Sequence, residues 1–476
     1  MRLSLGTNFD NDLLEQIADT KVKVVYGKLP QDIFGGGRPT ISLPEVTKDH
    51  LINHIKLAHS LGKEFNYLLN TNCMDNLEFR SDINKEIYEF IAWLDEIGVD
   101  WITVSIPYFI PVIKHIAPRI KVSLSTFAYV DTLQKALAFE KMGVDEITLP
   151  EGLNRNFKLL KLFTQNLKCE IQLIATNLCL AACPYRIYHS NSQSHASQRN
   201  HVSNGVTFDY CMLNCTAKTL ESPAEFVKIP WIRPEDLHVY EEIGISSIKL
   251  TERMKKTERL VEIAKAYSDR KYEGDLNRLL NFRIKGDFIT PNHDLLEGAD
   301  MYNVECLIES RELLFQRDVE ICNKQLDGFI DYFVNKDTDC RNELCGITCK
   351  YCDKYAAKAI KSDWKDEAMV SNNIREFLKK VVCGAMSKVD DRCDYIWNDQ
   401  LNDKLNSLLL KKPEFIRSSI RRTIIKAAED NAHKYGRNEI LLEDLLIANY
   451  LNTPKEFRIN LKDEMIRLNI EVPEED

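Results

Sequence analysis

The chain has 476 residues, enough for about three domains at roughly 150 residues each. It has 63 basic and 72 acidic residues, a formal charge of −9, so we do not expect its whole surface to coat nucleic acid or an anionic membrane, although a nucleic-acid substrate stays open. Its 44% hydrophobic and 28% charged content is ordinary for a soluble globular protein and argues against global disorder.

No apolar run is long enough to predict a membrane span, and the first residues lack the apolar core of a signal peptide, so we expect a cytoplasmic protein. The unusual number is the cysteine count, which is 14. Thiols stay reduced in a cytoplasm, so this many cysteines indicates metal binding or redox chemistry rather than disulfides.

Three segments of the N-terminal half repeat one pattern, in which a helix ends at a glycine and a short strand follows. The glycines are Gly98, Gly143 and Gly244. Glycine suits the left-handed position that ends a helix, and repeated use of this joint is typical of alternating β/α architecture.

Short apolar runs predict eight strands of the buried, parallel kind. They span about residues 2–6, 22–27, 64–70, 101–105, 121–125, 146–149, 170–175 and 245–250. Eight such units predict a (β/α)8 TIM-like barrel over residues 1–275. A doubly wound open sheet is the alternative, but no Gly-x-Gly-x-x-Gly follows the first strand.

The active site of such a barrel lies at the C-terminal ends of the strands. Lys249 and Arg253 place two cations there, which suits an anionic small molecule, since Arg can hold a carboxylate through two hydrogen bonds. Salt bridges to neighbouring acids are the alternative for this pair. Four polar residues at other strand ends could orient a substrate or simply cap the strands: Asn70, Asn72, Ser125 and Thr126.

A first group of cysteines follows the predicted seventh strand, in two Cys-x3-Cys pairs. Its members are Cys179, Cys183, Cys211 and Cys215. An iron–sulfur cluster needs four convergent thiolates, which two such pairs can supply. We therefore predict a 4Fe–4S cluster at the barrel mouth; zinc and buried packing cysteines are the alternatives.

The segment between the two pairs, His189 to Gly205, is rich in Ser, Asn, Gln and His. We expect a mobile, solvated loop or lid, with its histidines as ligands or bases in the alternative reading.

A second group of cysteines lies within 13 residues, with spacings of 4, 3 and 2 residues. Its members are Cys340, Cys345, Cys349 and Cys352. Such a run resembles a ferredoxin-type ligand set, so we predict a second iron–sulfur cluster in a cysteine-rich, mainly helical region over residues 276–400. Zinc is the alternative metal, and a group of reactive or exposed thiols is the alternative to a metal site.

The barrel, the cysteines after the seventh strand and one further run together resemble the collagenase-like peptidase family over residues 1–275. The run is Ile245-Ser-Ser-Ile-Lys249-Leu-Thr-Glu-Arg253-Met-Lys-Lys-Thr-Glu-Arg-Leu-Val. That family closes its barrel with a Lys-Ile-Glu-Gly-Arg-Met-Lys-Ser-Pro-Glu-Tyr-like run. Lys249 and Arg253 match its Lys and Arg, whereas Thr251 and Glu252 stand where it has Glu and Gly.

Members of this family were first named peptidases, and others are anaerobic hydroxylation proteins for ubiquinone, ribosomal RNA and transfer RNA. They carry a 4Fe–4S cluster and use prephenate as oxygen donor. Some take a cluster ligand from earlier in the barrel, which leaves Cys73 as the alternative to one of the four predicted ligands here.

The resemblance implies an iron–sulfur oxidoreductase or hydroxylase that modifies an organic, peptide or nucleic-acid substrate without O2. Lys249 and Arg253 would be its catalytic residues and would hold the donor's carboxylates, with a redox or substrate-presenting protein as partner. One alternative is a peptidase, although the chain has no Gly-x-Ser-x-Gly elbow and no His-Glu-x-x-His motif. Another is a non-catalytic iron–sulfur assembly protein.

Residues 410–455 read as a small helical domain that opens at Pro413. Their pattern resembles the small C-terminal domain of light-independent protochlorophyllide reductase, which implies a docking or lid module. A basic face of Arg417, Arg421 and Arg422 could serve that role or be solvated helix. We expect the acidic tail, 456–476, to fray.

Overall fold

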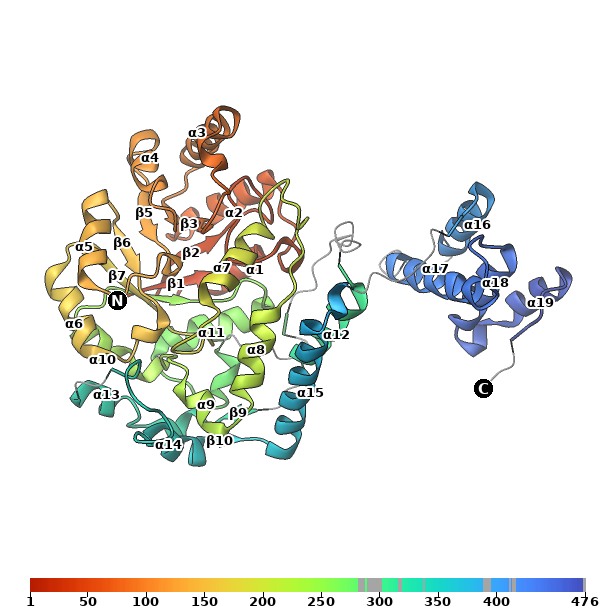
Figure 1. The fold of residues 1–476 in the computed structure, drawn as a ribbon. Coiled ribbons are helices and arrows are strands. Elements are labelled where there is room, and N and C mark those ends of the chain that lie inside the picture. The colour runs from red at the N-terminus through yellow and green to blue at the C-terminus, as the bar shows by residue number, and fades with distance from the viewer. Residues whose placement is uncertain are drawn as a thin grey trace. The chain divides into compact units, whose positions relative to one another are not determined.

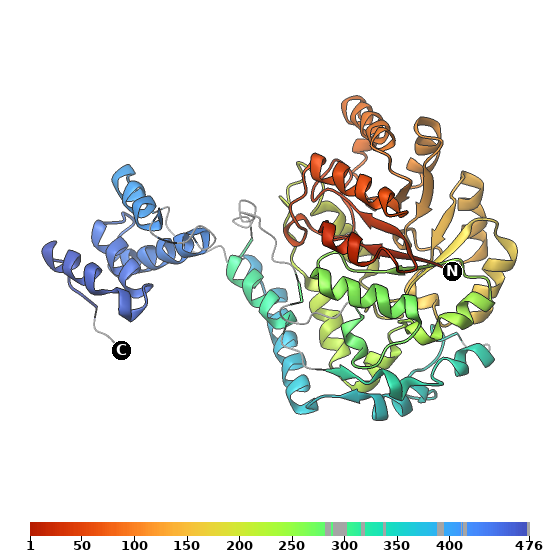
Figure 2. The same cartoon turned by 180° about the vertical axis from the view of Figure 1, so that it is seen from behind.

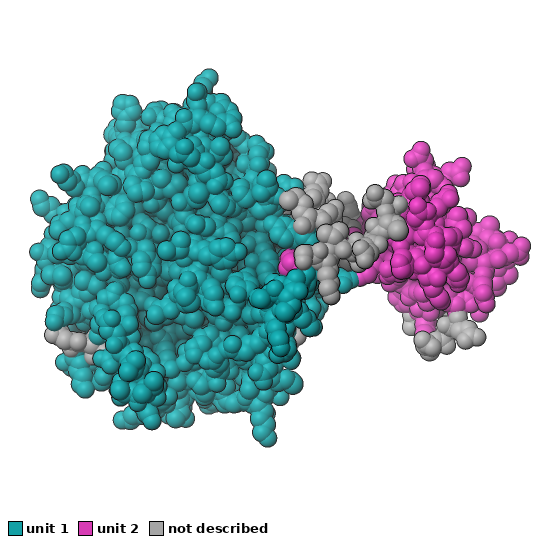
Figure 3. All heavy atoms as spheres, in the orientation of Figure 1, with its two compact units in different colours: residues 1–385 teal, residues 386–476 magenta. Residues whose placement is uncertain are grey.

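The computed structural model describes residues 1–280, 287–288, 302–315, 319–336, 339–387, 395–410, 412 and 417–473. The chain forms two compact units, Met1–Ala385 and Met386–Asp476, shown in teal and magenta in Figure 3. No helix among the described residues is long and apolar enough to cross a membrane.

The first unit contains a closed barrel of eight parallel strands, which confirms the predicted fold (Figure 1). The strands are β1 (Arg2–Gly6), β2 (Val22–Gly27), β3 (Glu64–Leu69), β4 (Trp101–Val104), β5 (Lys121–Leu124), β6 (Glu146–Thr148), β7 (Glu170–Ile174) and β8 (Ser247–Leu250). Each strand pairs with the next in chain order, and β8 closes the barrel on β1 with Leu3 opposite Ile248. All eight predicted strands are present.

Helices surround the strands in both views of the ribbon (Figure 1; Figure 2). They are α1 (Asn11–Gln16), α2 (Lys48–Ser60), α3 (Ser81–Glu96), α4 (Phe109–Ile116), α5 (Leu133–Met142), α6 (Phe157–Asn166), α10 (Leu237–Glu242) and α11 (Thr257–Asp269). The predicted joints are confirmed, since Gly98, Gly143 and Gly244 have φ angles of +92°, +104° and +89°.

Short 3-10 turns connect many of these elements. They are η1 (Thr40–Ser42), η2 (Leu77–Phe79), η3 (Thr126–Ala128), η4 (Glu151–Leu153), η5 (Pro234–Asp236), η6 (Leu276–Arg278), η8 (Asn323–Leu326), η9 (Ala385–Ser387) and η11 (Lys455–Phe457).

The barrel interior holds a hydrogen-bonded polar network below the mouth. Glu146 on β6 pairs with Arg2 and accepts a hydrogen bond from Ser123 over 2.8 Å. Gln172 on β7 donates to the other Glu146 oxygen and to Ser247, over 3.2 and 2.8 Å. Buried polar groups are stable when they are paired in this way, so the network holds Glu146 and its partners in place inside the barrel.

The connection from β7 to β8 is long and contains three helices: α7 (Arg186–His195), α8 (Tyr210–Thr219) and α9 (Pro223–Lys228). The extension after the barrel packs on α8 and α9 within the same compact unit. Its described elements are α12 (Val304–Leu314), β9 (Glu320–Ile321), α13 (Asp331–Asn335), α14 (Tyr351–Ala359), β10 (Ile360–Lys361) and α15 (Trp364–Val382). It is mainly helical, as predicted.

The second unit has four described helices: α16 (Asp399–Leu410), α17 (Arg417–Lys434), α18 (Leu442–Leu451) and α19 (Ile459–Arg467). Leu405, Ala428 and Leu445 belong to its buried core. Two arginines of the predicted basic face form hydrogen bonds inside this unit. Arg417 donates to the carbonyl of Lys412, and Arg421 donates to the side-chain oxygen of Asn406. The predicted helix opening at Pro413 lies outside the described residues.

Candidate functional site

A cavity of about 230 Å³ opens where the barrel strands end. Strand-end residues form its floor, and α7, α8 and the loop around Arg38 form its walls. The cavity therefore lies where a (β/α)8 fold places its active site.

All four cysteines of the first group line this cavity. Cys179 and Cys183 lie in the loop between β7 and α7, and Cys211 and Cys215 lie four residues apart on α8. Residues at this spacing share one face of a helix. The fold therefore brings the two predicted pairs, 27 residues apart in sequence, to one space.

The thiols of this group influence one another electrostatically. Burial, with the charge of Glu151, raises the pKa of Cys179 to about 12, and Cys183 adds to the rise while Arg186 opposes it. Burial, with Cys183, also raises the pKa of Cys211 to about 12. Thiolates here are costly unless a cation compensates them, and bound iron would supply that compensation.

The donor set of this group consists of four thiols around one cavity. A cubane cluster binds each of four thiolates through a different iron atom, and a zinc ion can also take four thiolates. The residues present therefore fit an iron–sulfur cluster.

A chain of polar contacts links this cysteine group to β5 and β6. Arg186, at the start of α7, forms an ion pair of 2.5 Å with Glu151 and donates to Thr126 over 2.8 Å. Asn177 donates to Glu151 over 2.5 Å and to the sulfur of Cys179 over 3.3 Å. Such outer contacts orient metal ligands. The sequence carries no signal that Arg186 would pair with Glu151.

The two predicted cations both line the cavity. The ammonium group of Lys249 lies 4.3 Å from the ring centroid of Tyr26, and burial lowers its pKa to about 8. Burial, with the charge of Arg38, also lowers the pKa of Arg253 to about 10. Nη1 of Arg253 is buried without a hydrogen-bond partner, and no salt bridge joins either cation to an acid of the described residues. The cavity can therefore receive an anion.

Glu252 has a φ of +110°, a conformation that glycine adopts readily and other residues rarely do. Its carboxylate accepts hydrogen bonds from the backbone amides of Arg253 and Met254, over 2.9 and 3.1 Å. The resembling family has Gly at this position, and the backbone angle explains that preference. Here the carboxylate fixes the turn that presents Arg253.

The four predicted substrate residues differ in their placement. Asn70, Ser125 and Thr126 line the cavity, and Oδ1 of Asn70 is buried without a hydrogen-bond partner. Ser125 accepts a hydrogen bond from the amide of Phe127, which caps η3. Asn72 is not among the lining residues; it donates to Ser190 on α7 over 2.5 Å. Asn70 is thus best placed to contact a ligand, and Asn72 anchors α7.

The segment predicted to be a mobile loop is instead largely structured, because α7 ends only at His195. Its small polar side chains bond to nearby carbonyls, as Ser194 does to Ser190 over 2.8 Å and Ser197 to Gln193 over 3.2 Å. Ser194 and Ser197 are fully buried. Polarity here reflects internal hydrogen bonding rather than exposure to solvent.

The second cysteine group is also brought together, in the loop before α14 and at its first turn. Burial raises the pKa of Cys352 to about 12, and the other three cysteines add to the rise. The charge of Arg155 opposes this rise in the pKa of Cys352. The buried guanidinium group of Arg155 also lies 5.0 Å from the ring centroid of Trp231 and 4.8 Å from that of Phe329. Nothing in the sequence indicates this role of Arg155, which lies 185 residues before Cys340.

The chain thus combines a closed parallel barrel with a thiol-lined, cationic mouth. Residues 41–273 match the model of peptidase family U32. This match confirms the predicted resemblance to the collagenase-like peptidase family. The resemblance of the C-terminal segment to protochlorophyllide reductase stays a prediction.

Two relatives and one solved structure resemble the chain. The uncharacterized protease MJ1657 of Methanocaldococcus jannaschii is 27% identical over 337 residues, 71% of this chain and 88% of that protein. The tRNA hydroxylation protein P of Helicobacter pylori is 26% identical over 176 residues, 33% of this chain and 41% of that protein. The structure of the U32 peptidase Mk0906 is 19% identical, with a TM-score of 0.41, and the match covers 53% of this chain and 93% of that one.

Proposed function

We propose that this chain is an iron–sulfur oxidoreductase that modifies its substrate without O2, by hydroxylation. The observation that carries the proposal is that four cysteines share one cavity with two cations, Lys249 and Arg253, neither of which forms a salt bridge among the described residues. The similarity to a tRNA hydroxylation protein supports the same reaction type. The substrate is an organic molecule, a peptide or a nucleic acid.

In this proposal a 4Fe–4S cluster is held by the first cysteine group, Cys179, Cys183, Cys211 and Cys215. When bound, the cluster supplies electron transfer and Lewis-acidic iron. Lys249 and Arg253 bind the carboxylates of an anionic oxygen donor, for which we propose prephenate. Oδ1 of Asn70 accepts a hydrogen bond from a hydroxyl of that donor. Because these groups lie in a buried cavity, their charges act through a lower dielectric than in water.

We further propose that Cys340, Cys345, Cys349 and Cys352 hold a second iron–sulfur cluster, with zinc as the alternative. The buried Arg155 would lower the cost of holding negative thiolates there. This centre would pass electrons from a redox partner protein or would hold the extension in place.

The alternative function is peptide hydrolysis, because the family and one relative are named as peptidase and protease. Cysteines that hold iron are not free nucleophiles, so the two functions make opposite predictions about iron. Protein stripped of iron would keep peptidase activity but would lose any hydroxylation. A third function, non-catalytic cluster assembly, would be contradicted if the purified chain turned over substrate by itself.

The test is anaerobic purification followed by counts of iron and acid-labile sulfide. We expect iron for two clusters in the natural chain, and about half of it in Cys179→Ala and in Cys345→Ala. Cys169→Ala is the matched control, because Cys169 is partly buried but belongs to neither group. Bound zinc without visible iron–sulfur absorption would contradict the proposal.

A further inference from the structure

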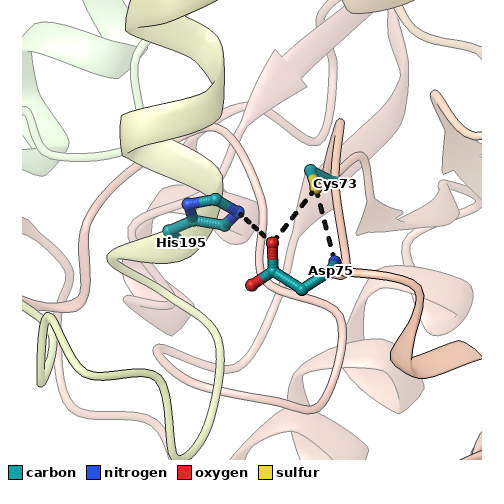
Figure 4. Close-up of side chains that lie close together, drawn as sticks. All are labelled: Cys73, Asp75 and His195. Atoms are coloured by element: carbon teal, nitrogen blue, oxygen red, sulfur yellow. Dashed lines mark hydrogen bonds and ion pairs between the residues drawn. The ribbon is translucent and has the colours of Figure 1, made fainter.

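A separate set of metal-binding side chains lies between the loop after β3 and the end of α7 (Figure 4). Cys73 and Asp75 come from the loop, and His195 is the last residue of α7. One ligand atom of each lies within 4.8 Å of the others. Cys73 is not among the residues that line the barrel cavity, so it lies apart from the four cysteines there.

We propose that Cys73, Asp75 and His195 bind one divalent metal ion of the zinc type. The Cys73 sulfur lies 3.5 Å from Oδ1 of Asp75, and Nε2 of His195 lies 3.8 Å from the same oxygen. Tetrahedral zinc with one thiolate, one imidazole and one carboxylate ligand needs donor atoms roughly 3.4–3.6 Å apart. The thiol–carboxylate and imidazole–carboxylate distances are therefore already close to those that zinc requires.

The environment of Nε2 of His195, whose contact with Asp75 is too long for a hydrogen bond, is an independent sign of a ligand. Its Nε2 atom is buried and has no hydrogen-bond partner among the described residues. A buried polar atom without a partner is costly, and a metal ion in front of it would remove that cost. His195 also lies at the C-terminal end of a ten-residue helix, where the helix dipole favours a cation.

The loop that carries the other two ligands is already shaped for this role. The backbone amide of Asp75 donates to the Cys73 sulfur over 3.3 Å, a contact that stabilises a thiolate. The Cys73 carbonyl is held by Thr71 over 3.0 Å and by Gln198 over 2.5 Å. Asp75 itself has a φ of +53°, an unusual conformation outside glycine.

The Cys73 thiol is placed to donate to Oδ1 of Asp75. Metal binding would displace this proton and leave thiolate and carboxylate both bound to the cation. Three protein ligands leave a fourth position, which water can reach because Asp75 is half exposed.

Metal binding would restrain the position of α7. The helix α7 contributes Arg186, His189, Ser190 and Gln193 to the wall of the barrel cavity. A metal bridge from Cys73 to His195 would fasten the end of this helix to the loop after β3. This proposal does not depend on the proposed iron–sulfur function, because it concerns a different set of ligands.

The test uses the full chain, purified anaerobically, equilibrated with Zn2+ and dialysed. Zinc and iron per chain are counted in the natural protein, Cys73→Ser, His195→Gln and the control Cys169→Ser. Since other cysteines can also bind zinc, the differences between variants carry the result. We expect Cys73→Ser and His195→Gln each to lose one zinc per chain with iron unchanged, and Cys169→Ser to lose none.

Binding of Co2+ gives a spectroscopic check, since thiolate-to-cobalt absorption should fall in Cys73→Ser but not in Cys169→Ser. Asp75→Asn is a further variant for the case in which Cys73→Ser or His195→Gln does not fold. Asp75 is half exposed, so its replacement should disturb the fold little. This variant should also bind one zinc fewer per chain. Equal zinc in all variants would overturn the proposal. Loss of iron instead of zinc from Cys73→Ser would also overturn it and would make Cys73 a cluster ligand.

Discussion

The ammonium group of Lys249 lies 4.3 Å from the ring centroid of Tyr26, at the floor of the barrel cavity. The tyrosine is held in place because its hydroxyl donates to the carbonyl of Leu250 over 2.9 Å. Burial lowers the pKa of Lys249 to about 8, with Glu146 opposing and Arg253 adding to the change. Lys249 therefore changes its charge within the range of ordinary assays.

Binding of a dicarboxylate such as prephenate should depend on this charge. Lys249 is a cation below a pH of about 8 and loses its proton above it, so affinity should fall as the pH rises through that value. Lys249→Met should bind about ten- to a hundredfold more weakly at neutral pH and lose the pH dependence. Calorimetric titration over a pH series measures both effects.

Lys63→Met is the control for this titration. Lys63 is also a buried lysine with a lowered pKa, but its ammonium group donates to the carbonyls of Ala18 and Val22 and is not among the cavity residues. Its replacement should leave the pH profile of binding unchanged. A natural chain whose affinity is flat across pH 8 would contradict the role of Lys249.

Arg253→Met should weaken ligand binding without lowering the stability of the ligand-free chain. Nη1 of Arg253 is buried without a hydrogen bond to any described residue, so the charge is costly until an anion arrives. Replacement by an apolar side chain of similar length should leave the ligand-free melting temperature unchanged or raise it, and should strongly weaken dicarboxylate binding. Thermal unfolding with and without the ligand measures both.

Arg233→Met is the matched contrast, because this buried arginine is fully paired. It forms ion pairs of 2.8 Å with Asp236 and 3.0 Å with Asp327. Removing one partner from a buried pair is expected to cost about 3–5 kcal/mol of unfolding free energy. If Arg253→Met destabilised the ligand-free chain as much as Arg233→Met, Arg253 would have a structural partner and not a ligand-binding role.

The strands and their order could be predicted from the sequence because two local signals coincide, namely short apolar runs and glycines such as Gly98 that end helices. The position of Cys179 at the barrel mouth followed from chain order alone. These features depend on local backbone conformation and on the known geometry of the fold.

Other features depend on contacts between distant segments and could not be predicted. Arg155 meets the second cysteine group only in the folded chain, and Arg186 meets Glu151 across two strand ends. The residues around Ser194 read as a solvated loop because their polarity is ordinary for one; the structure shows that they bond internally. Side-chain polarity does not reveal whether a partner is water or protein.

Glu252 offers a test of the backbone strain beside the candidate anion site. Its φ of +110° is expected to cost about 1–3 kcal/mol, which its two hydrogen bonds to backbone amides partly offset. Glu252→Ala keeps the strain and loses the bonds, whereas Glu252→Gly loses both. Glu252→Gly should therefore be more stable than Glu252→Ala by about 1 kcal/mol in denaturant unfolding; the reverse order would contradict the strain.

Gly35 controls the docking of α7 over the cavity. It has a φ of +78°, and a Cβ atom there would lie 2.3 Å from the backbone carbonyl oxygen of Ser194. The neighbouring amide of Gly36 donates to Ser197 over 2.8 Å, so this loop and the end of α7 form one contact. A methyl group at Gly35 must push the two apart.

We therefore expect Gly35→Ala to lower the unfolding free energy by more than the cost of its backbone angle alone. Gly62→Ala isolates that cost, since Gly62 has a φ of +69° and open space around its Cβ position; it should lose about 1 kcal/mol. Gly35→Ala should also speed amide hydrogen exchange in residues 186–198, because separation of the loop frees the end of α7. Equal stability of the two variants, with unchanged exchange in α7, would show that the Gly35 contact does not hold the helix in place.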